Sequence, residues 1–456
     1  MGFSKTALAL LSLSASALSI PLAAPPTYGS PTSYGNTTEI TPNPHNGHWV
    51  DTWTTQPQLT EFANLPPPPF NATDLVFFNS TIRQTLHMTL GAEQVRIRLS
   101  NRFGLNAVPI TKVTIALPIA EPGQNLTGAS AINTTTVQTL TFSGNESIVI
   151  PNAALVVSDP VNFPIGAQQI ITVTMYLATG QASNYITSHP GSRTQSWISF
   201  GDYTEAANMT DVSTQSVFHW FYLSAVEGWM QQGNRAFVVL GDSITDGRVS
   251  WNNANGRWPD YLFTRMQTYG PTKQISIVNQ AAGGGRVLMD GNGPNTVSRI
   301  DRDVLAQSGV KYAMIFEGVN DIGTAANDTL NNTETGDALI QAYKQMITRV
   351  HTAGIPFFGA TITPFGAPND TLQAYSTPER LAQRDRVNAW IRTSGAFDAV
   401  IDFDKIVRDP ANPEQLNPLY NSGDYLHPNE DGYHAMARGF PLDIFEQYQS
   451  GVSTFM

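Results

Sequence analysis

A change in the hydrophobic pattern near residue 234 constrains the fold of this chain most strongly. After that point, near-continuous apolar runs alternate with helical stretches, which is typical of a parallel sheet covered on both faces. The apolar runs predict strands at 236–241, 275–280, 311–318, 356–365 and 397–403, and the clearest helical stretches cover 336–354 and 377–395. The C-terminal half of the chain is therefore expected to form an α/β domain.

The segment from 47 to 229 has a different pattern, in which short strands are separated by Gly, Pro and Asn. In 93–101 apolar residues alternate with polar ones, namely Val95, Ile97 and Leu99 against Arg96, Arg98 and Ser100. This period of two predicts a half-buried strand, with the arginines on a solvated or interdomain face. Many such strands predict an all-β sandwich or jelly roll ahead of the α/β domain.

The N-terminus has the features of an export signal. Lys5 precedes an apolar run that ends in small residues near Ala24, which predicts a secretory signal peptide over 1–24. The Met1-Gly2 start also fits an N-myristoylation pattern, but an apolar segment directly behind it suits export better. Residues 25–46 are rich in Pro, Ser and Thr and predict an extended leader. The expected domains are therefore 47–229 and 230–456.

Sites for N-glycosylation agree with an exported chain. The acceptor pattern N-x-[ST] occurs ten times, at Asn36, Asn71, Asn79, Asn125, Asn133, Asn145, Asn208, Asn327, Asn331 and Asn369. Each match alone is weak, but together with the signal they predict a secreted, extracellular glycoprotein.

Composition excludes several classes of partner and chemistry. The chain has 36 Asp and Glu against 25 Lys and Arg, for a net charge of -11, which argues against binding nucleic acid or anionic membrane surfaces. It has no Cys, so disulfides, thiolate metal sites and a Cys nucleophile are excluded. After the signal, no apolar run approaches the roughly 20 residues that span a bilayer.

Polar side chains follow the first three predicted strands of the α/β domain, where ligands bind in open parallel sheets. Ser243 in GDSITDG follows the first strand and is either a nucleophile or an ordinary helix cap. The second strand leads into three glycines, 283–285, which permit close approach of backbone to a bound group or form a plain turn. Asn320 follows the third strand, where it or Asp321 supports a turn.

The last chemical signal is an Asp424 carboxylate three residues before His427. A carboxylate at this spacing can accept a hydrogen bond from the imidazole and fix its tautomer. With Ser243, this supplies a nucleophile, a base and an orienting group for acyl transfer, which requires no metal or organic cofactor. The G-x-S-x-G elbow of α/β hydrolases is absent.

These residues resemble the SGNH, or GDSL-type, hydrolases. GDSITDG is similar to their first block, the glycine turn to the second, GVND to the third and DYLH to the last. The resemblance implies a flavodoxin-like three-layer α/β/α domain with a parallel sheet. It implies a triad of Ser243, Asp424 and His427, and an oxyanion hole of Ser243, Gly284 and Asn320. Gly283 and Gly285 are the alternatives to Gly284 in this role.

The resemblance extends to a subgroup of secreted hydrolases with a β domain ahead of the catalytic one, and it implies a carboxylic ester hydrolase. Secretion and aromatic residues near Ser243, namely Trp251 and Trp258, favour short acyl groups on carbohydrates or small molecules, although both tryptophans equally fit a place in the core. Alternatives are a lipase or phospholipase A, and a catalytically weak glycan-binding protein. The β domain is expected to act as a scaffold, a cap or a glycan platform.

Overall fold

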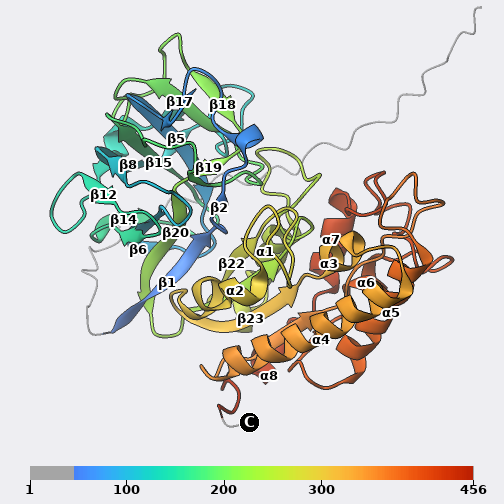
Figure 1. Cartoon of the computed structure of the whole chain (residues 1–456). Helices are drawn as coiled ribbons and strands as arrows, with labels where there is room; N and C mark the ends of the chain where they lie inside the picture. Colours follow the sequence, from blue (N-terminus) through green and yellow to red (C-terminus); the bar gives the residue numbers. More distant parts are fainter. Residues whose placement is uncertain (1–45, 455–456) are drawn as a thin grey trace, which may run out of the picture. The chain divides into compact units, whose positions relative to one another are not determined.

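The computed structural model describes residues 46–454, which form two regions (Figure 1). An antiparallel β-rich region runs from β1 (Gly47–Thr54) to β20 (Leu223–Gln231), and an α/β region begins with β21 (Arg235–Gly241). Contacts join both regions into one compact unit. The predicted signal peptide, and the leader apart from its last residue, lie outside the described residues, and the predicted domain boundaries stay predictions.

The β-rich region contains two larger antiparallel sheets whose apolar side chains meet in one core. As predicted, Val95, Ile97 and Leu99 point into this core and are fully buried. The first sheet has the order β1, β20, β6 (Ala92–Ser100) and β13 (Leu155–Val157), with β14 (Val161–Ile165) also paired to β6. The second has the order β11 (Gln138–Thr139), β8 (Lys112–Ala116), β15 (Ile170–Leu177), β5 (Ser80–His87), β17 (Ser196–Phe200) and β18 (Gln215–Val217).

Shorter pairings complete this region. A small sheet joins β19 (Trp220–Phe221), β16 (Thr187–His189) and β2 (Gln58–Leu59). The remaining strands pair in twos: β3 (Asn71–Ala72) with β4 (Leu75–Val76), β7 (Val108–Ile110) with β12 (Ile148–Ile150), and β9 (Pro118–Ile119) with β10 (Ala131–Ile132). One-turn 3-10 helices occur at Phe62–Asn64 and Thr134–Thr136.

The α/β region is built on one parallel sheet. Its order is β22 (Ile275–Ala281), β21, β23 (Val310–Phe316), β24 (Phe357–Ala360) and β25 (Val400–Ile401). Numbered from the first strand, this is 2-1-3-4-5, the flavodoxin-like order, in which the direction of winding reverses between the first and third strands. The predicted fold class is confirmed, and in folds with this strand order ligands bind beyond the carboxyl ends of the strands at the switch point, here β21 and β23.

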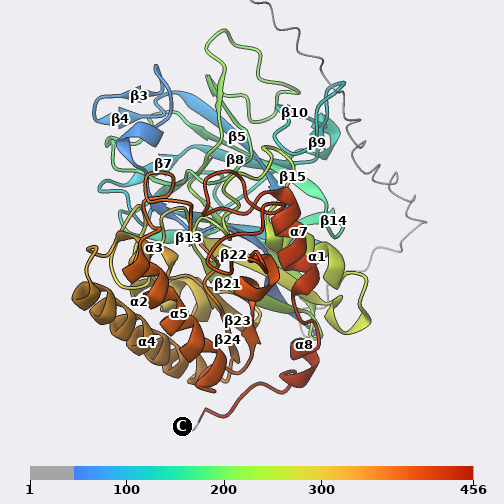
Figure 2. The same ribbon diagram turned by 90° about the vertical axis from the view of Figure 1, so that its right-hand side faces the viewer.

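Helices cover both faces of this sheet, as Figure 2 shows: α2, α4 and α5 lie on one side, and α1, α7 and α8 on the other. The helices are α1 (Trp258–Met266), α2 (Thr296–Ile300), α3 (Val319–Thr324), α4 (Thr329–His351), α5 (Pro378–Thr393), α6 (Phe403–Val407), α7 (Glu430–Gly439) and α8 (Ile444–Gln447). A 3-10 turn at Gly270–Thr272 and a π turn at Asp301–Leu305 complete the region. Helix α4 begins earlier than the predicted 336, because the Asp328 side chain accepts a hydrogen bond from the Asn331 N–H and caps it.

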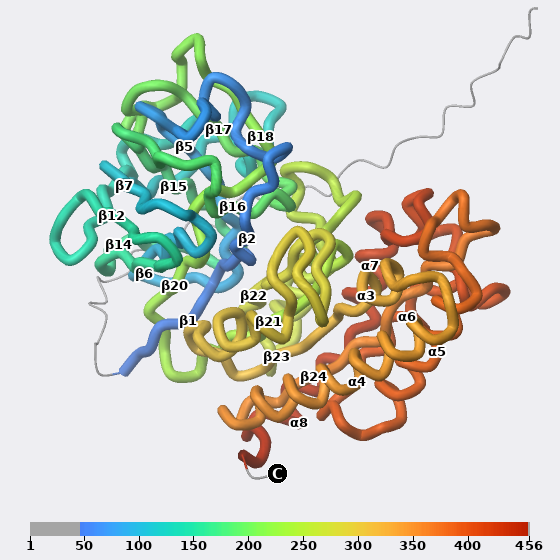
Figure 3. The backbone as a smooth tube through the Cα atoms, in the orientation of Figure 1, coloured from blue at the N-terminus to red at the C-terminus, as the bar shows by residue number. Residues whose placement is uncertain are grey.

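The two regions meet along β1, which leads from the β-rich sheet to β22 (Figure 3). The Asp51 carbonyl accepts a hydrogen bond from Ser276 Oγ at 2.7 Å, and its carboxylate accepts one from the Ser308 N–H at 2.7 Å. Arg98 joins this contact through ion pairs with Asp51 and Glu227. Of the two predicted environments for Arg98, the interdomain one is therefore correct.

Candidate active site

Ser243 lies just beyond the end of β21 and is 7% exposed. Its Oγ is 2.8 Å from Nε2 of His427. The adjacent Asp242 stabilises the turn that follows β21, because its carboxylate accepts a hydrogen bond from the Ile244 N–H at 2.9 Å. The expectation of a helix directly after Ser243 was wrong: the chain makes turns there, and α1 begins only at Trp258, so the backbone N–H groups near Ser243 act without a helix dipole.

His427 is held between Ser243 and Asp424. Its Nδ1 is 2.6 Å from Asp424 Oδ2, while Asp424 Oδ1 accepts hydrogen bonds from the backbone N–H groups of Leu426 at 2.9 Å and His427 at 2.8 Å. These three contacts fix the carboxylate in one orientation. A ring N–H directed at Asp424 leaves the other ring nitrogen, Nε2, free to accept the Ser243 hydroxyl proton.

The electrostatics keep Asp424 ionised. Burial alone would raise its pKa, but the hydrogen bond and charge of the His427 ring, together with the backbone N–H groups, hold the pKa of Asp424 well below its usual range. The carboxylate therefore remains negative at every pH at which His427 can act as a base. A fixed negative charge there stabilises the imidazolium that forms when His427 takes a proton.

The glycine turn after β22 contributes one unbonded N–H group. The Gly283 N–H donates to Asp246 Oδ2 at 3.1 Å, and the Gly285 N–H donates to the Ala282 carbonyl at 3.1 Å. Neither Gly284 nor Ser243 uses its N–H for a hydrogen bond within residues 46–454. Gly284 also has a φ of +73°, a conformation that favours glycine.

Asn320 reaches the same turn from the end of β23. Its Nδ2 donates to the Gly285 carbonyl at 2.9 Å, and its Oδ1 accepts from the Tyr375 hydroxyl at 3.1 Å. The Tyr375 contact sets the orientation of the amide, with the NH₂ group toward the glycine turn. Sequence analysis missed Tyr375, because it lies in an irregular segment 55 residues away. Asp321 supports the turn itself by accepting the N–H groups of Val287 and Leu288, both at 2.9 Å.

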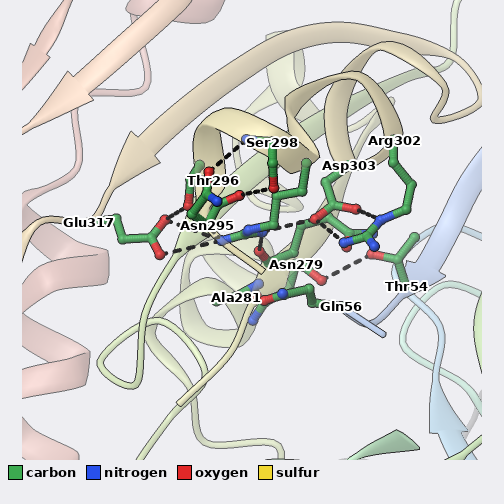
Figure 4. Close-up of polar contacts among 12 residues, drawn as sticks. Thr54, Gln56, Asn279, Ala281, Asn295, Thr296, Ser298, Arg302, Asp303 and Glu317 are labelled. Atoms are coloured by element: carbon green, nitrogen blue, oxygen red, sulfur yellow. Dashed lines mark hydrogen bonds and ion pairs between the residues drawn. The ribbon is translucent and has the colours of Figure 1, made fainter. Parts of the chain in front are cut away.

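Three buried carboxyl groups, those of Asp242, Glu317 and Asp321, lie behind these loops. Burial raises the pKa of Glu317 to about 7 and that of Asp321 to about 6, and burial together with the charge of Glu317 raises the pKa of Asp242 well above its usual range. Glu317 also accepts hydrogen bonds from Thr296 Oγ1 at 2.5 Å and from Arg299 at 3.1 Å (Figure 4).

The two tryptophans near Ser243 have different environments. Trp258 is fully buried and donates a hydrogen bond to Thr245 Oγ1 at 3.1 Å, so it belongs to the core. Trp251 is 71% exposed. Of this predicted aromatic pair, only Trp251 can contact a ligand from solvent.

Residues 46–454 contain no group of three or more His, Asp or Glu side chains arranged to hold a metal ion. None of the helices within this range has the length and apolar character to cross a bilayer.

Comparison with known proteins identifies the α/β region. Residues 239–435 match the model of the GDSL-like lipase/acylhydrolase family. No protein with a curated description matches the chain.

Three solved structures that are similar to the chain each match less than half of it. A G-D-S-L family protein from Desulfitobacterium hafniense DCB-2 is 22% identical, over 45% of this chain and 97% of that protein, with a TM-score of 0.34. A carbohydrate acetylesterase family member from Sinorhizobium meliloti is 14% identical, over 46% of this chain and 98% of that protein, with a TM-score of 0.36. A GDSL-like lipase from Bacteroides thetaiotaomicron VPI-5482 is 17% identical, over 45% and 84%, with a TM-score of 0.32. Residues 239–435 therefore form a GDSL-like lipase/acylhydrolase domain.

Proposed function

We propose that this protein is a secreted serine esterase that removes short acyl groups, such as acetyl, from carbohydrates or small molecules. The observation that carries the proposal is the line of contacts from Ser243 Oγ to His427 at 2.8 Å and from His427 to Asp424 at 2.6 Å. A hydroxyl, an imidazole and a carboxylate in this order are what nucleophilic acyl transfer requires.

In this mechanism, His427 takes the Ser243 proton while Oγ attacks the ester carbonyl carbon. The tetrahedral intermediate collapses, and His427 returns the proton to the departing alcohol, which leaves an acyl group on Ser243. Water, deprotonated by His427, then attacks this ester and releases the acid. Asp424 stabilises the imidazolium in both halves of the reaction.

The negative oxygen of each intermediate needs donors, and we assign them to the N–H groups of Ser243 and Gly284 and the amide of Asn320. The choice of Gly284 over its neighbours is supported by hydrogen bonding, because the N–H groups of Gly283 and Gly285 already have acceptors. Preorganised donors of this kind are each worth about 3 kcal/mol of transition-state stabilisation.

A second candidate, a lipase or phospholipase A that prefers longer acyl chains, is favoured by one specific observation. Val249 and Trp251 follow Ser243 closely, Leu419 precedes His427, and all three side chains are largely exposed, at 48%, 71% and 72%. Such apolar surface suits a hydrocarbon chain, although Trp251 also suits the face of a sugar ring. Rates for p-nitrophenyl esters of increasing chain length, beside acetylated polysaccharide and phospholipid, separate the two candidates.

Export and glycosylation belong to the proposal as well. The nine described acceptor asparagines are all exposed or half-buried, so none would need to leave the core to carry a glycan. The tenth, Asn36, lies outside the described residues. Expression in a eukaryotic host, with N-terminal sequencing and deglycosylation of the secreted product, tests both parts: loss of residues 1–24 and a fall in mass are expected.

The decisive experiment for the reaction is Ser243→Ala. We expect hydrolysis of p-nitrophenyl acetate to fall by about 10⁴-fold or more, because the nucleophile is lost while the oxyanion donors remain. Ser250→Ala, a change of another buried serine seven residues later, is the control for the substitution itself. Full activity in the Ser243→Ala variant contradicts the mechanism.

A further inference from the structure

A buried histidine of the β-rich region contacts the loop that follows the catalytic serine. His189 ends β16, and its Nε2 is 2.9 Å from Oδ1 of Asp246. The other carboxylate oxygen of Asp246 accepts the Gly283 N–H at 3.1 Å. One aspartate therefore connects the β-rich region to the glycine turn that precedes Gly284.

The contact is shielded from solvent. The side chains of His189 and Asp246 are only 3% and 4% exposed, and the ring of Trp220 stacks on His189 at 5.8 Å. The second ring nitrogen of His189, Nδ1, is 3.0 Å from the Gln56 carbonyl. Each ring nitrogen of His189 thus lies within hydrogen-bond distance of an oxygen. Burial strengthens such hydrogen bonds.

Arg257 of the α/β region links the backbone of Asp246 to the β-rich region. Arg257 donates from Nε to the Asp246 carbonyl at 3.1 Å and from Nη2 to the carbonyl of Ser192. Between Ser192 and His189, Gly191 lies so close that an added Cβ would be 1.9 Å from Asp246 Oδ2. The turn 189–192 is therefore shaped around this carboxylate.

We infer that His189 is a positioning residue for the oxyanion-binding turn: through Asp246 it holds Gly283, and so keeps the Gly284 N–H directed away from competing acceptors. The inference rests on the proposed function, because it assigns Gly284 a role in catalysis. It gives the β-rich region a part in the reaction itself, beyond scaffold, cap or glycan platform.

Two substitutions of similar size separate the contacts of His189. The amide nitrogen of His189→Gln occupies the place of Nε2 and can still donate to Asp246, whereas that of His189→Asn occupies the place of Nδ1 and reaches only the Gln56 carbonyl. We expect His189→Asn to lower kcat for p-nitrophenyl acetate at least tenfold with KM within twofold. We expect His189→Gln to keep kcat within about threefold of the unchanged protein.

A matched control comes from a second histidine–aspartate pair. His351 Nε2 is 2.8 Å from Asp398 Oδ2, and neither residue contacts the site loops in the described structure. His351→Asn breaks an equivalent contact and should leave kcat unchanged, with thermal melting measured for all variants. Equal losses of kcat in His189→Asn and His189→Gln, or wild-type kcat in both, overturn the inference.

Asp246→Asn provides an independent test should the His189 variants fold poorly. His189 and Gly283 face different oxygens of Asp246, and an amide replaces one of these oxygens by an NH₂ group, which cannot accept, so we expect the same tenfold fall in kcat. Wild-type kcat in this variant overturns the inference. Ser243→Ala separates a failure of the proposed function from a failure of the positioning role. If Ser243→Ala is inactive while Asp246→Asn is fully active, the proposed function stands and only the positioning role fails.

Discussion

The two regions of this molecule contribute to the site in different ways. In the α/β region, Ser243 and Asn320 follow neighbouring parallel strands, and the switch in winding between β21 and β23 opens the crevice where they meet. The β-rich region contacts the loops of the site at several places, among them the turn that begins at His189 and the side chain of Gln58, which donates to the Asn292 carbonyl at 3.1 Å. The proposed reaction thus uses side chains at the strand ends of the α/β region, and the β-rich region acts on these side chains through buried contacts.

The comparison teaches that contacts between the regions have separable effects. The contacts along β1 involve Asp51 and Arg98 and should affect stability, because their partners Ser276, Ser308, Glu227 and Gln307 make no hydrogen bond to Ser243, Asp424 or His427. The contacts of His189 hold the glycine turn through Asp246 and should affect kcat. Substitutions in each region test this separation.

Asp424→Asn should have the largest effect, because it acts on the reacting groups directly. An asparagine at this position favours the wrong imidazole tautomer and cannot stabilise the imidazolium, so we expect kcat to fall by about 10⁴-fold. Steady-state hydrolysis of p-nitrophenyl acetate measures it, with the exposed Asp431→Asn as control. A fall of less than tenfold would remove Asp424 from the triad.

Arg98→Ala tests the contact between the regions. Its loss leaves Asp51 and Glu227 buried without their shared cation, and burial already raises the pKa of Asp51 to about 7. We expect the free energy of unfolding to fall by about 3–5 kcal/mol, with little change in kcat of the folded protein. Chemical denaturation measures the effect, and exposed Arg102→Ala is the control. A selective loss of kcat at full stability would contradict the separation.

Tyr375→Phe should have a smaller effect within the α/β region. The hydroxyl that orients the Asn320 amide is lost while the ring remains, so one hydrogen bond worth about 1 kcal/mol disappears. We expect kcat to fall about fivefold to tenfold with KM unchanged. Asn320→Ala, measured beside it, should lose about 10²-fold or more. If Tyr375→Phe has no effect in the presence of a large Asn320→Ala effect, the amide is oriented by other contacts.

Glu430→Gln should have the smallest effect, which is a change in how the free energy of unfolding depends on pH. Burial, followed by the charges of Asp260 and Asp431, raises the pKa of Glu430 from 4.5 to about 7. The folded chain then retains a proton that the unfolded chain has lost, so the free energy of unfolding falls as the pH rises between these values.

Glutamine does not titrate, and the variant should therefore gain stability relative to the unchanged protein between pH 5 and pH 8. We expect a gain of about 1 kcal/mol, below the full value of the shift because the side chain is partly exposed. Thermal melting across this pH range measures it, with Glu334→Gln on α4 as the control for loss of one charge. If the difference in stability between the Glu430→Gln variant and the unchanged protein is the same at every pH, the raised pKa of Glu430 is contradicted.

Much of the fold was predictable, because the spacing of apolar residues within a short segment indicates which of its side chains are buried. The alternation in β6 predicted the buried Val95, Ile97 and Leu99, and the apolar runs after residue 234 predicted the parallel strands. The extent of elements was less predictable: the run at 397–403 yields a strand of only two residues, because Asp402 caps α6 directly afterwards. Side-chain capping thus decided where the periodic pattern stopped.

The sequence by itself determined which chemical groups this protein has at its strand ends: Ser243, the glycine turn, Asn320, and Asp424 with His427. Each lies in a local motif, and parallel strands bring such motifs to one edge of the sheet. Tertiary structure alone decided which glycine N–H stays unbonded, that Tyr375 orients Asn320, and that His189 contacts Asp246. These contacts join residues tens of positions apart, so no local pattern encodes them, and only the packing of the folded chain brings the partners within hydrogen-bond distance.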